Sequence, residues 1–111
     1  IFFAPYDLLI TSIWIYNGAQ GAAGTTEYDL LLASPGGAFS TILSTTGKIT
    51  SAAAANIWTD SGTIIGAQGG VTKPVISTST ISAGQAIRFD LLASQTTTAT
   101  DARIRIFYTK L

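Results

Sequence analysis

Two stretches near the end of the chain alternate between apolar and charged residues, and this period limits the chain to a small set of folds. Residues 85–92 and residues 102–110 both place apolar side chains at every second position, with charged residues between them. The charged positions are Arg88, Asp90, Arg103 and Arg105. A strand turns successive side chains to opposite faces, so a period of two buries one face and leaves the other in water. The Ser/Thr-rich segment between the two stretches predicts a loop that joins them as an antiparallel pair.

Six further segments have the β-branched and aromatic content or the alternation of strands, and glycine, serine or proline turns separate them. They are 8–16, 26–33, 39–43, 56–59, 63–65 and 75–78. About eight short strands predict an all-β fold, an antiparallel β-sandwich of jelly-roll type. Within 8–16 the apolar spacing breaks at Thr11 and Ser12, which predicts a bulge where the strand switches faces. The alanines at 52–55 are compatible with one helical turn, and 44–74 is the part that the sequence defines least.

Charge is scarce in this chain. It has 6 basic and 6 acidic residues among 111, so its formal net charge is zero and only 11% of its residues are charged. A chain of this length builds one core, and we expect a single domain over 1–111 that forms the C-terminal tip of a longer chain. No basic excess is present to attract nucleic acid, and the apolar runs are too short to insert across a membrane. So few charges suggest that part of the surface is buried against copies of the same chain.

Residue types that carry most reaction chemistry are missing. The chain has no histidine and no cysteine, which removes the commonest general base, thiol nucleophiles and most transition-metal ligands. We therefore expect no enzyme activity and no cofactor. Carboxylates at Asp7, Asp60 and Asp101 are scattered among turns and do not form the clustered motif of a calcium site, so no metal is expected. The glycine-rich segment 17–24 precedes a predicted strand rather than a helix, which predicts a flexible loop and not a phosphate cradle.

Aromatic residues are the best candidates for binding a ligand. Trp58 lies in a polar patch between Asn56 and Asp60, and a sugar can stack on an exposed ring while neighbouring amides and carboxylates bond its hydroxyl groups. Trp58 as a plug in the core or in an interface is the alternative interpretation. Asn17 and Gln20, in the glycine-rich segment, are further candidates for contact with a ligand.

A second group of residues is predicted to meet another subunit. Trp14 and Tyr16 alternate with Ile13 and Ile15, so both faces of this strand are apolar; the two rings therefore face a subunit, or a bulge turns them inward. If the charged strands are neighbours, half of the charges of the chain share the outward face of one sheet. These are Glu27, Asp29, Arg88, Asp90, Arg103 and Arg105. They pair across strands within one subunit or across an interface between copies. Glu27 and Asp29 also have the spacing of a pair of glycosidase carboxylates. Ion pairs with Arg88, Arg103 and Arg105 are the favoured interpretation of these two residues.

Three short motifs resemble a β-sandwich domain found in phage virion and tail-fibre proteins, and related sandwiches that cap the trimeric adhesive fibres of bacteria. Residues 4–7 with 10–13 resemble its opening strand, 81–84 with 87–90 its late turn and strand, and 103–108 its closing strand. The sequence departs from the family at Gln85, where an aspartate is common, and in a long Ala/Gly-rich segment between Lys48 and Lys73. The resemblance implies a trimeric, adhesive domain at a fibre tip or on a virion, without catalytic residues.

Together these observations favour a non-enzymatic recognition domain that acts as a homotrimer outside the cell or on a virion surface. Its expected partners are other copies of itself and a glycan or another envelope component of a cell surface. Two alternatives stay open: a structural virion or decoration domain that binds only virion proteins, and a monomeric carbohydrate-binding module.

Overall fold

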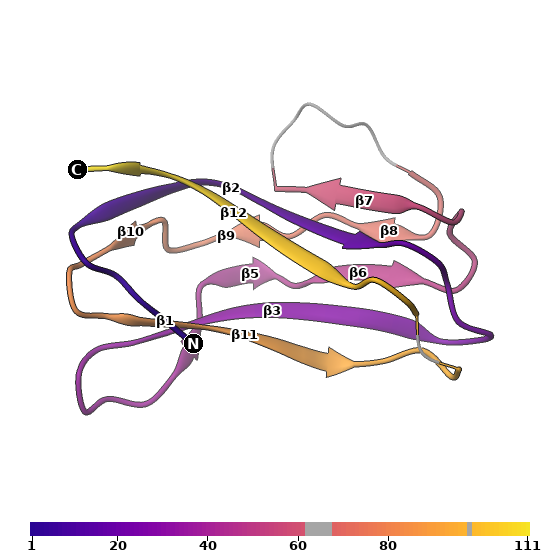
Figure 1. Ribbon diagram of the computed structural model, residues 1–111, viewed down its shortest axis with the longest axis horizontal. Helices are drawn as coiled ribbons and strands as arrows, with labels where there is room; N and C mark the ends of the chain where they lie inside the picture. The colour runs from indigo at the N-terminus through magenta and orange to yellow at the C-terminus, as the bar shows by residue number, and fades with distance from the viewer. Residues whose placement is uncertain (62–67, 98) are drawn as a thin grey trace.

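The computed structural model describes residues 1–61, 68–97 and 99–111, and the described residues form antiparallel sheets packed as a β-sandwich (Figure 1). This confirms the predicted fold class. Twelve strands are present in the described part of the chain, where about eight were predicted, because several strands are only two residues long. Among the described residues there is no helix, and so none that is long and apolar enough to cross a bilayer.

The larger sheet, called here the β3 sheet, has the order β1-β11-β3-β6-β8, with β4 also paired to β3. Its strands are β1 (Phe2–Phe3), β3 (Thr25–Ala33), β4 (Ser40–Thr41), β6 (Gly47–Thr50), β8 (Val71–Thr72) and β11 (Ala86–Ala93). The second, the β2 sheet, has the order β10-β2-β12, with β7 also paired to β2. Its strands are β2 (Leu8–Asn17), β7 (Ile57–Asp60), β10 (Thr80–Ile81) and β12 (Arg103–Lys110). A small pair joins β5 (Leu43–Thr45) to β9 (Val75–Ile76).

The predicted bulge in β2 is confirmed. Phe107 of β12 pairs with Ser12 and the next residue, Tyr108, pairs with Ile10, so Thr11 is left without an opposite residue. An extra residue in a strand moves every side chain beyond it to the opposite face of the sheet. Leu8 and Ile10 point inward before the bulge, and Ile13 and Ile15 point inward after it. The bulge thus keeps both halves of β2 facing the core.

Two groups of buried residues form the core between the sheets. The larger group joins Leu8, Ile10 and Ile13 of β2 to Leu30 of β3 and Ile87 of β11. The smaller group joins Ile15 of β2 to Tyr28, Ile49 and Ala53. The predicted alternation in β3 is also observed, because Tyr28 and Leu30 are buried against the opposite sheet and Leu32 packs at the edge of the core.

The predicted pairing of the two alternating strands is wrong. β11 pairs with β3 and β1, whereas β12 pairs with β2, so they belong to opposite sheets. The predicted common charged face is therefore wrong as well. Glu27, Asp29, Arg88 and Asp90 lie on the β3 sheet, and Arg103 and Arg105 lie on the β2 sheet. Alternation identifies a strand and its buried face, but it does not identify the strand beside it.

In the middle of the chain, residues 51–56 form turns and not a helix. The predicted strand at 56–59 is observed as β7, whereas the predicted strand at 63–65 lies outside the described residues. The strands β6, β8 and β10 were not predicted, because each is too short to show a period.

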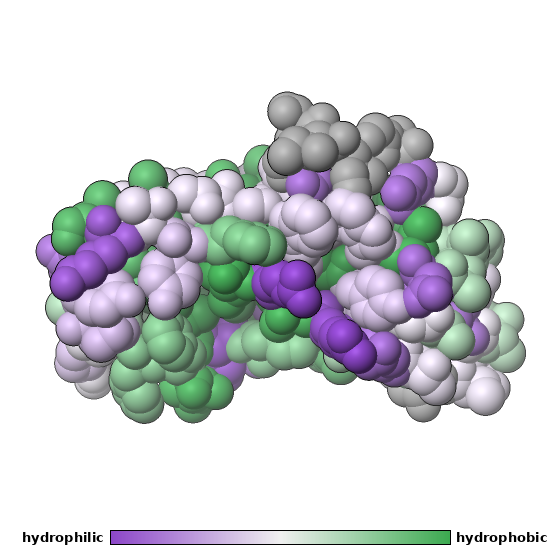
Figure 2. Space-filling model, turned by 45° about the horizontal axis from the view of Figure 1, so that its top comes forward, coloured by the Kyte–Doolittle hydropathy of each residue, from purple (hydrophilic) through white to green (hydrophobic). Residues whose placement is uncertain are grey.

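One side of the sandwich is open. β11 and β12 are the last strands of their sheets on this side for most of their length, and no ladder of hydrogen bonds joins them in the described structure. On the other side β7 lies against β6 and β8. Inner side chains are therefore exposed at the open side: Phe89 is 38% and Leu91 is 51% exposed. Figure 2 shows hydrophobic surface gathered at the left and centre of the molecule, crossed by a few strongly hydrophilic groups.

Candidate functional site

The outer face of the β2 sheet gathers most of the residues that the sequence singled out. Because β2 pairs with β12 on one side and with β7 on the other, two rows of side chains cross three strands. The first row is Arg103, Tyr16 and Trp58, and the second is Arg105, Trp14 and Asp60. Directly opposite residues of antiparallel strands share a face. We call Trp14, Tyr16, Trp58, Arg103 and Arg105 the aromatic–arginine surface.

The two tryptophans form one unit. Their rings stack with centroids 4.2 Å apart and planes 8° from parallel, so Trp14 leans toward β7 and covers one face of Trp58. The Trp14 Nε1–H group donates a hydrogen bond of 2.9 Å to Ser12 Oγ, and Phe107 packs at 5.4 Å from the Trp14 ring. Both tryptophans remain half-buried at the surface. Trp58 is thus not a plug of the core, and the bulge before Trp14 and Tyr16 does not turn these rings inward.

Tyr16 and Arg103 continue this surface toward the loops. The Tyr16 hydroxyl donates a hydrogen bond to Asn56 Oδ1, which brings Asn56 of the predicted polar patch to the edge of the surface. The Arg103 guanidinium lies 5.8 Å from the centre of the Tyr16 ring. Its Nε–H group donates to Asp101 Oδ1 at 2.8 Å. Arg103 therefore has an acidic partner of its own.

Arg105 and Asp60 stand at the two ends of the second row, with Trp14 between them. Arg105 is exposed, and no carboxylate pairs with it among the described residues. Asp60 is only 1% exposed, and its Oδ1 atom has no hydrogen-bond partner in the described structure. Two interstrand spacings, about 9–10 Å, separate the two residues along the row.

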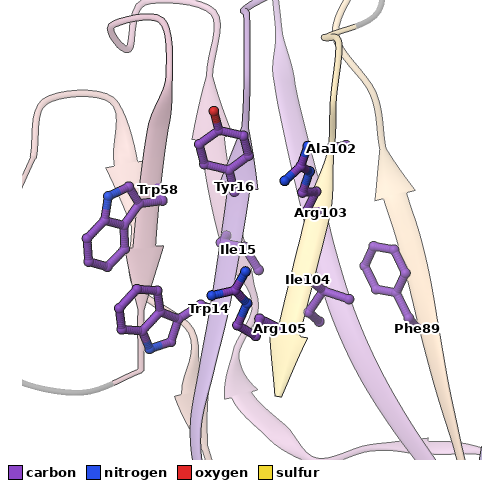
Figure 3. A pocket seen from close by; sticks show the side chains of 9 residues that line it. All are labelled: Trp14, Ile15, Tyr16, Trp58, Phe89, Ala102, Arg103, Ile104 and Arg105. Carbon is purple, nitrogen blue, oxygen red and sulfur yellow. The ribbon is translucent and has the colours of Figure 1, made fainter. Parts of the chain in front are cut away.

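A cavity of about 680 Å³ adjoins the aromatic–arginine surface (Figure 3). All five residues of the surface line it, together with Ile104 and, from the opposite sheet, Phe89. Figure 3 shows both arginine side chains extending from β12 toward the rings of β2. Because Phe89 belongs to β11, the cavity reaches the open side of the sandwich. Its volume lies in the range of small-molecule sites in proteins.

Asn17 and Gln20 do not belong to this surface. Asn17 is fully buried, and its amide group donates to Gln20 Oε1 at 3.1 Å and to Thr26 Oγ1 at 3.3 Å. Its Oδ1 atom accepts a hydrogen bond from the Tyr28 hydroxyl. Burial raises the pKa of Tyr28 to about 12. Asn17 therefore holds the fold and is not accessible to a ligand.

Gln20 links this buried group to a neighbouring loop. Its Oε1 atom accepts a hydrogen bond of 2.9 Å from Gln95 Nε2, and its own amide donates to the Ala54 carbonyl oxygen at 3.1 Å. We call the five side chains of this network the loop latch: Asn17, Gln20, Thr26, Tyr28 and Gln95. Backbone bridges at Ala19–Thr100 and Ala23–Thr96 lie beside it. The prediction of a flexible loop at 17–24 is thus corrected, because hydrogen bonds tie this segment along its length.

The remaining predicted interface residues lie on the β3 sheet and have partners there. Lys48 Nζ lies 3.9 Å from Glu27 Oε2. Asp29 is buried, and its Oδ1 atom accepts hydrogen bonds from the Leu30 amide and the Thr41 hydroxyl. Arg88 Nη2 donates to Asp90 Oδ2 at 3.0 Å, on its own strand. These contacts are local to the β3 sheet and do not involve Arg103 or Arg105.

Two residues that the sequence interpretation did not single out are Phe89 and Gln95. The alternation in 85–92 predicts Phe89 only as one apolar position of a strand, and the open side of the sandwich brings it to the cavity. Gln95 lies in a Ser/Thr-rich loop with no motif around it, yet it is buried and bonds Gln20 and the Ile49 carbonyl oxygen. No local signal in the sequence identifies either role.

Asp7, Asp60 and Asp101 lie on separate elements, and the described residues contain no group of three or more candidate metal ligands. Asp7 instead accepts a hydrogen bond of 2.8 Å from the Ala83 amide in the turn before β11. Comparison of the chain with protein-family models, with curated proteins and with solved structures finds no match.

Proposed function

We propose that this chain is a non-catalytic recognition domain that binds carbohydrate of a cell surface at the aromatic–arginine surface. The observation that carries the proposal is the cavity itself, where four aromatic rings and two guanidinium groups line one continuous space. Sugars combine apolar C–H faces, which pack against rings, with hydroxyl groups that accept hydrogen bonds from guanidinium N–H groups. The site offers both chemistries on strands, which hold side chains more rigidly than loops.

In this proposal the domain acts outside the cell or on a virion, in several copies. A single shallow site gives weak affinity, and copies held together in one particle or fibre raise the effective concentration of each site for the next ligand. Three copies in a fibre tip are the arrangement that we propose.

A variant of Trp58 tests the proposal. Binding of the purified domain to an array of cell-surface oligosaccharides is measured for wild type, Trp58→Ala and Phe3→Ala. Phe3 is an exposed aromatic residue of β1 that does not line the cavity, and it serves as the matched control. Loss of a ring contact weakens each site by about 3- to 10-fold, and many sites on an array multiply this effect.

We expect Trp58→Ala to lose array binding and Phe3→Ala to retain it, with circular dichroism showing that both variants stay folded. Equal binding by wild type and a folded Trp58→Ala protein would remove the aromatic–arginine surface as the site. Absence of wild-type binding to every saccharide would contradict the proposal as a whole.

The open side of the sandwich favours a second candidate, a structural domain that binds only other copies or other virion proteins. Phe89 and Leu91 leave apolar surface uncovered there. A smaller cavity of about 170 Å³ lies on the same side and is lined by Phe2, Leu8, Ile87, Ile106 and Tyr108. Attachment of the domain to particles, together with an empty saccharide array, would favour this candidate.

A further inference from the structure

We propose that the ligand of the aromatic–arginine surface is an acidic saccharide, and that Arg105 binds its anionic group. This inference rests on the proposed function and specifies the class of sugar. It follows from the charges around the cavity, because Arg105 lines the cavity and has no acidic partner in the described structure.

Three cations have an acidic partner in the described structure. Lys48 pairs with Glu27, Arg88 with Asp90, and Arg103 with Asp101. Arg105 has no such partner there, although it is exposed and lines the cavity of about 680 Å³. The guanidinium group presents N–H donors in a planar fork that matches a carboxylate or a sulfate with two parallel hydrogen bonds. A positive group without a partner in a concave site attracts an anionic ligand.

The carboxylate nearest in the row does not compensate Arg105. Asp60 lies on the far side of Trp14, is 1% exposed and does not line the cavity. Asp101 bonds Arg103 through Oδ1 at 2.8 Å. The ligand-facing wall therefore carries a net positive charge at Arg105.

The aromatic rings beside Arg105 select a sugar over a free anion. Arg105 is directly opposite Trp14, and Arg103 is directly opposite Tyr16, so each guanidinium group has a ring as its neighbour on β2. A saccharide with a charged substituent places its apolar C–H face against the rings while the charged group reaches Arg105. Inorganic anions gain nothing from the rings, and neutral sugars gain hydrogen bonds to the guanidinium groups but no ion pair with Arg105.

The test compares pairs of related acidic and neutral saccharides. Trigalacturonate and its methyl ester share one sugar backbone and differ in the carboxylate charge and a methyl group on each carboxyl, and sialyllactose and lactose differ in one acidic sugar. A heparin tetrasaccharide distinguishes sulfate from carboxylate as the source of the anion. Apparent Kd values are measured at 50 and 300 mM NaCl for wild type, Arg105→Gln, Arg105→Lys and Arg88→Gln. Arg88→Gln removes the same charge from the opposite sheet and is the matched control.

We expect wild type to bind acidic probes about 10- to 100-fold more tightly than neutral ones, the range for hydrogen bonds to charged groups. Arg105→Gln abolishes this preference. Arg105→Lys retains part of it, because lysine keeps the positive charge but lacks the planar fork of N–H donors. Arg88→Gln retains all of it. Salt weakens acidic binding alone, because screening acts on charges. A preference for the sulfated probe over the carboxylated ones identifies sulfate as the anion and supports the inference.

Equal affinity for acidic and neutral probes in wild type would overturn the acidic preference and leave carbohydrate binding in place. An acidic preference that persists in Arg105→Gln would place the anion elsewhere and overturn the role of Arg105. Absence of binding to all probes, neutral and acidic, would overturn carbohydrate binding itself, so the two failures are distinct.

Discussion

At the scale of single residues, polar side chains rather than apolar ones hold the loop end of this domain. The loop latch joins segments that are 74 residues apart in sequence between Gly21 and Gln95, where the Gln95 Oε1 atom accepts a hydrogen bond from the Gly21 amide. Asn17 and Gln95 are both buried, so their hydrogen bonds are made away from water. Removal of one partner leaves a buried polar atom unsatisfied, which costs more than the bond itself contributes.

Replacement of Tyr28 by Phe tests the latch. The Tyr28 hydroxyl bonds Asn17 Oδ1 and lies 3.2 Å from the Tyr16 carbonyl oxygen. We expect Tyr28→Phe to lower the free energy of unfolding at pH 7 by about 1–3 kcal/mol, because Asn17 Oδ1 is left unpaired. Urea unfolding measures this loss. No loss of stability would show that the hydroxyl is not needed by Asn17.

The pH dependence of stability gives a second readout of the same residue. The folded state holds the pKa of Tyr28 at about 12, above the ordinary tyrosine value of 10.0. The folded protein therefore keeps a proton that the unfolded chain loses, and the stability that is present below pH 10 falls as pH rises toward 12. Tyr108, whose pKa is raised chiefly by its hydrogen bond to Tyr6, contributes with the same sign. We expect Tyr28→Phe to show a smaller loss of stability between pH 10 and 12 than wild type.

Gly21 is required by the close approach of two loops. A Cβ atom at Gly21 would lie 1.9 Å from the Thr97 carbonyl oxygen, far inside van der Waals contact. We expect Gly21→Ala to lower the free energy of unfolding by about 2–3 kcal/mol, as strained substitutions do. Gly69→Ala is the control, because no atom of the described residues lies within 4 Å of a Cβ placed there. Thermal unfolding with equal midpoints for the two variants would contradict the close approach.

At the scale of elements, the alternation in the sequence predicts the strands and their inner faces. Each side chain of a strand points to the face opposite to that of the residue before it, so the pattern of apolar residues is enough to identify the buried face. The spans of β2, β3, β11 and β12 were predicted to within one residue at each end. The partner strands of β11 and β12 were not predicted. Strand pairing depends on the sheet to which each strand belongs, and β11 and β12 belong to two sheets that face each other across the core. Short strands such as β8 have no period of their own and are formed by the partner strand.

Deletion of Thr11 tests the role of the β2 bulge. Without Thr11, Leu8, Ile10, Ile13 and Ile15 follow one uninterrupted period of two, and the pairing with β12 becomes continuous at Tyr108 and Phe107. We expect this deletion to leave a folded domain and to lower the free energy of unfolding by less than about 2 kcal/mol. The reason is that a bulge is one extra residue in a strand, and its removal restores regular pairing. Circular dichroism and thermal unfolding measure the result.

Deletion of Asp29, in the continuous part of β3, is the matched control. It moves Leu30 and Leu32 to the outer face, since a one-residue slip reverses every side chain beyond it. We expect this variant to be unfolded. A folded protein lacking Asp29, or an unfolded protein lacking Thr11, would refute the explanation of the bulge.

At the scale of the whole molecule, the sandwich is closed on one side by β7 against β6 and β8 and open on the other. The sequence indicated a surface buried against other copies through its scarcity of charge, and it placed that surface at Trp14 and Tyr16. The candidate ligand site followed from Trp58 within a polar patch. The link between Trp58 and Arg105 could not be predicted, because it requires β7 and β12 to lie on either side of β2.

We propose that copies associate through the open side, and the mass in solution tests this. Light scattering after size exclusion is expected to give a mass near three chains for wild type and near one chain for Leu91→Lys, at an exposed position of β11 that does not line the ligand cavity. Val75→Lys, at an exposed apolar position of β9, is expected to keep the wild-type mass. A monomeric wild type at all concentrations would contradict association of the isolated domain.

The loop latch also has a consequence for how such a domain diverges in evolution. In immunoglobulins the loops vary while the sheets stay constant. Here a change at Asn17, Gln20 or Gln95 disturbs three segments at once, so each replacement demands a second one elsewhere. A replacement at Arg105 or Trp58 alters one side chain on a strand and leaves the ladder intact. We expect descendants of this domain to keep their loops and to acquire new specificities on the sheet.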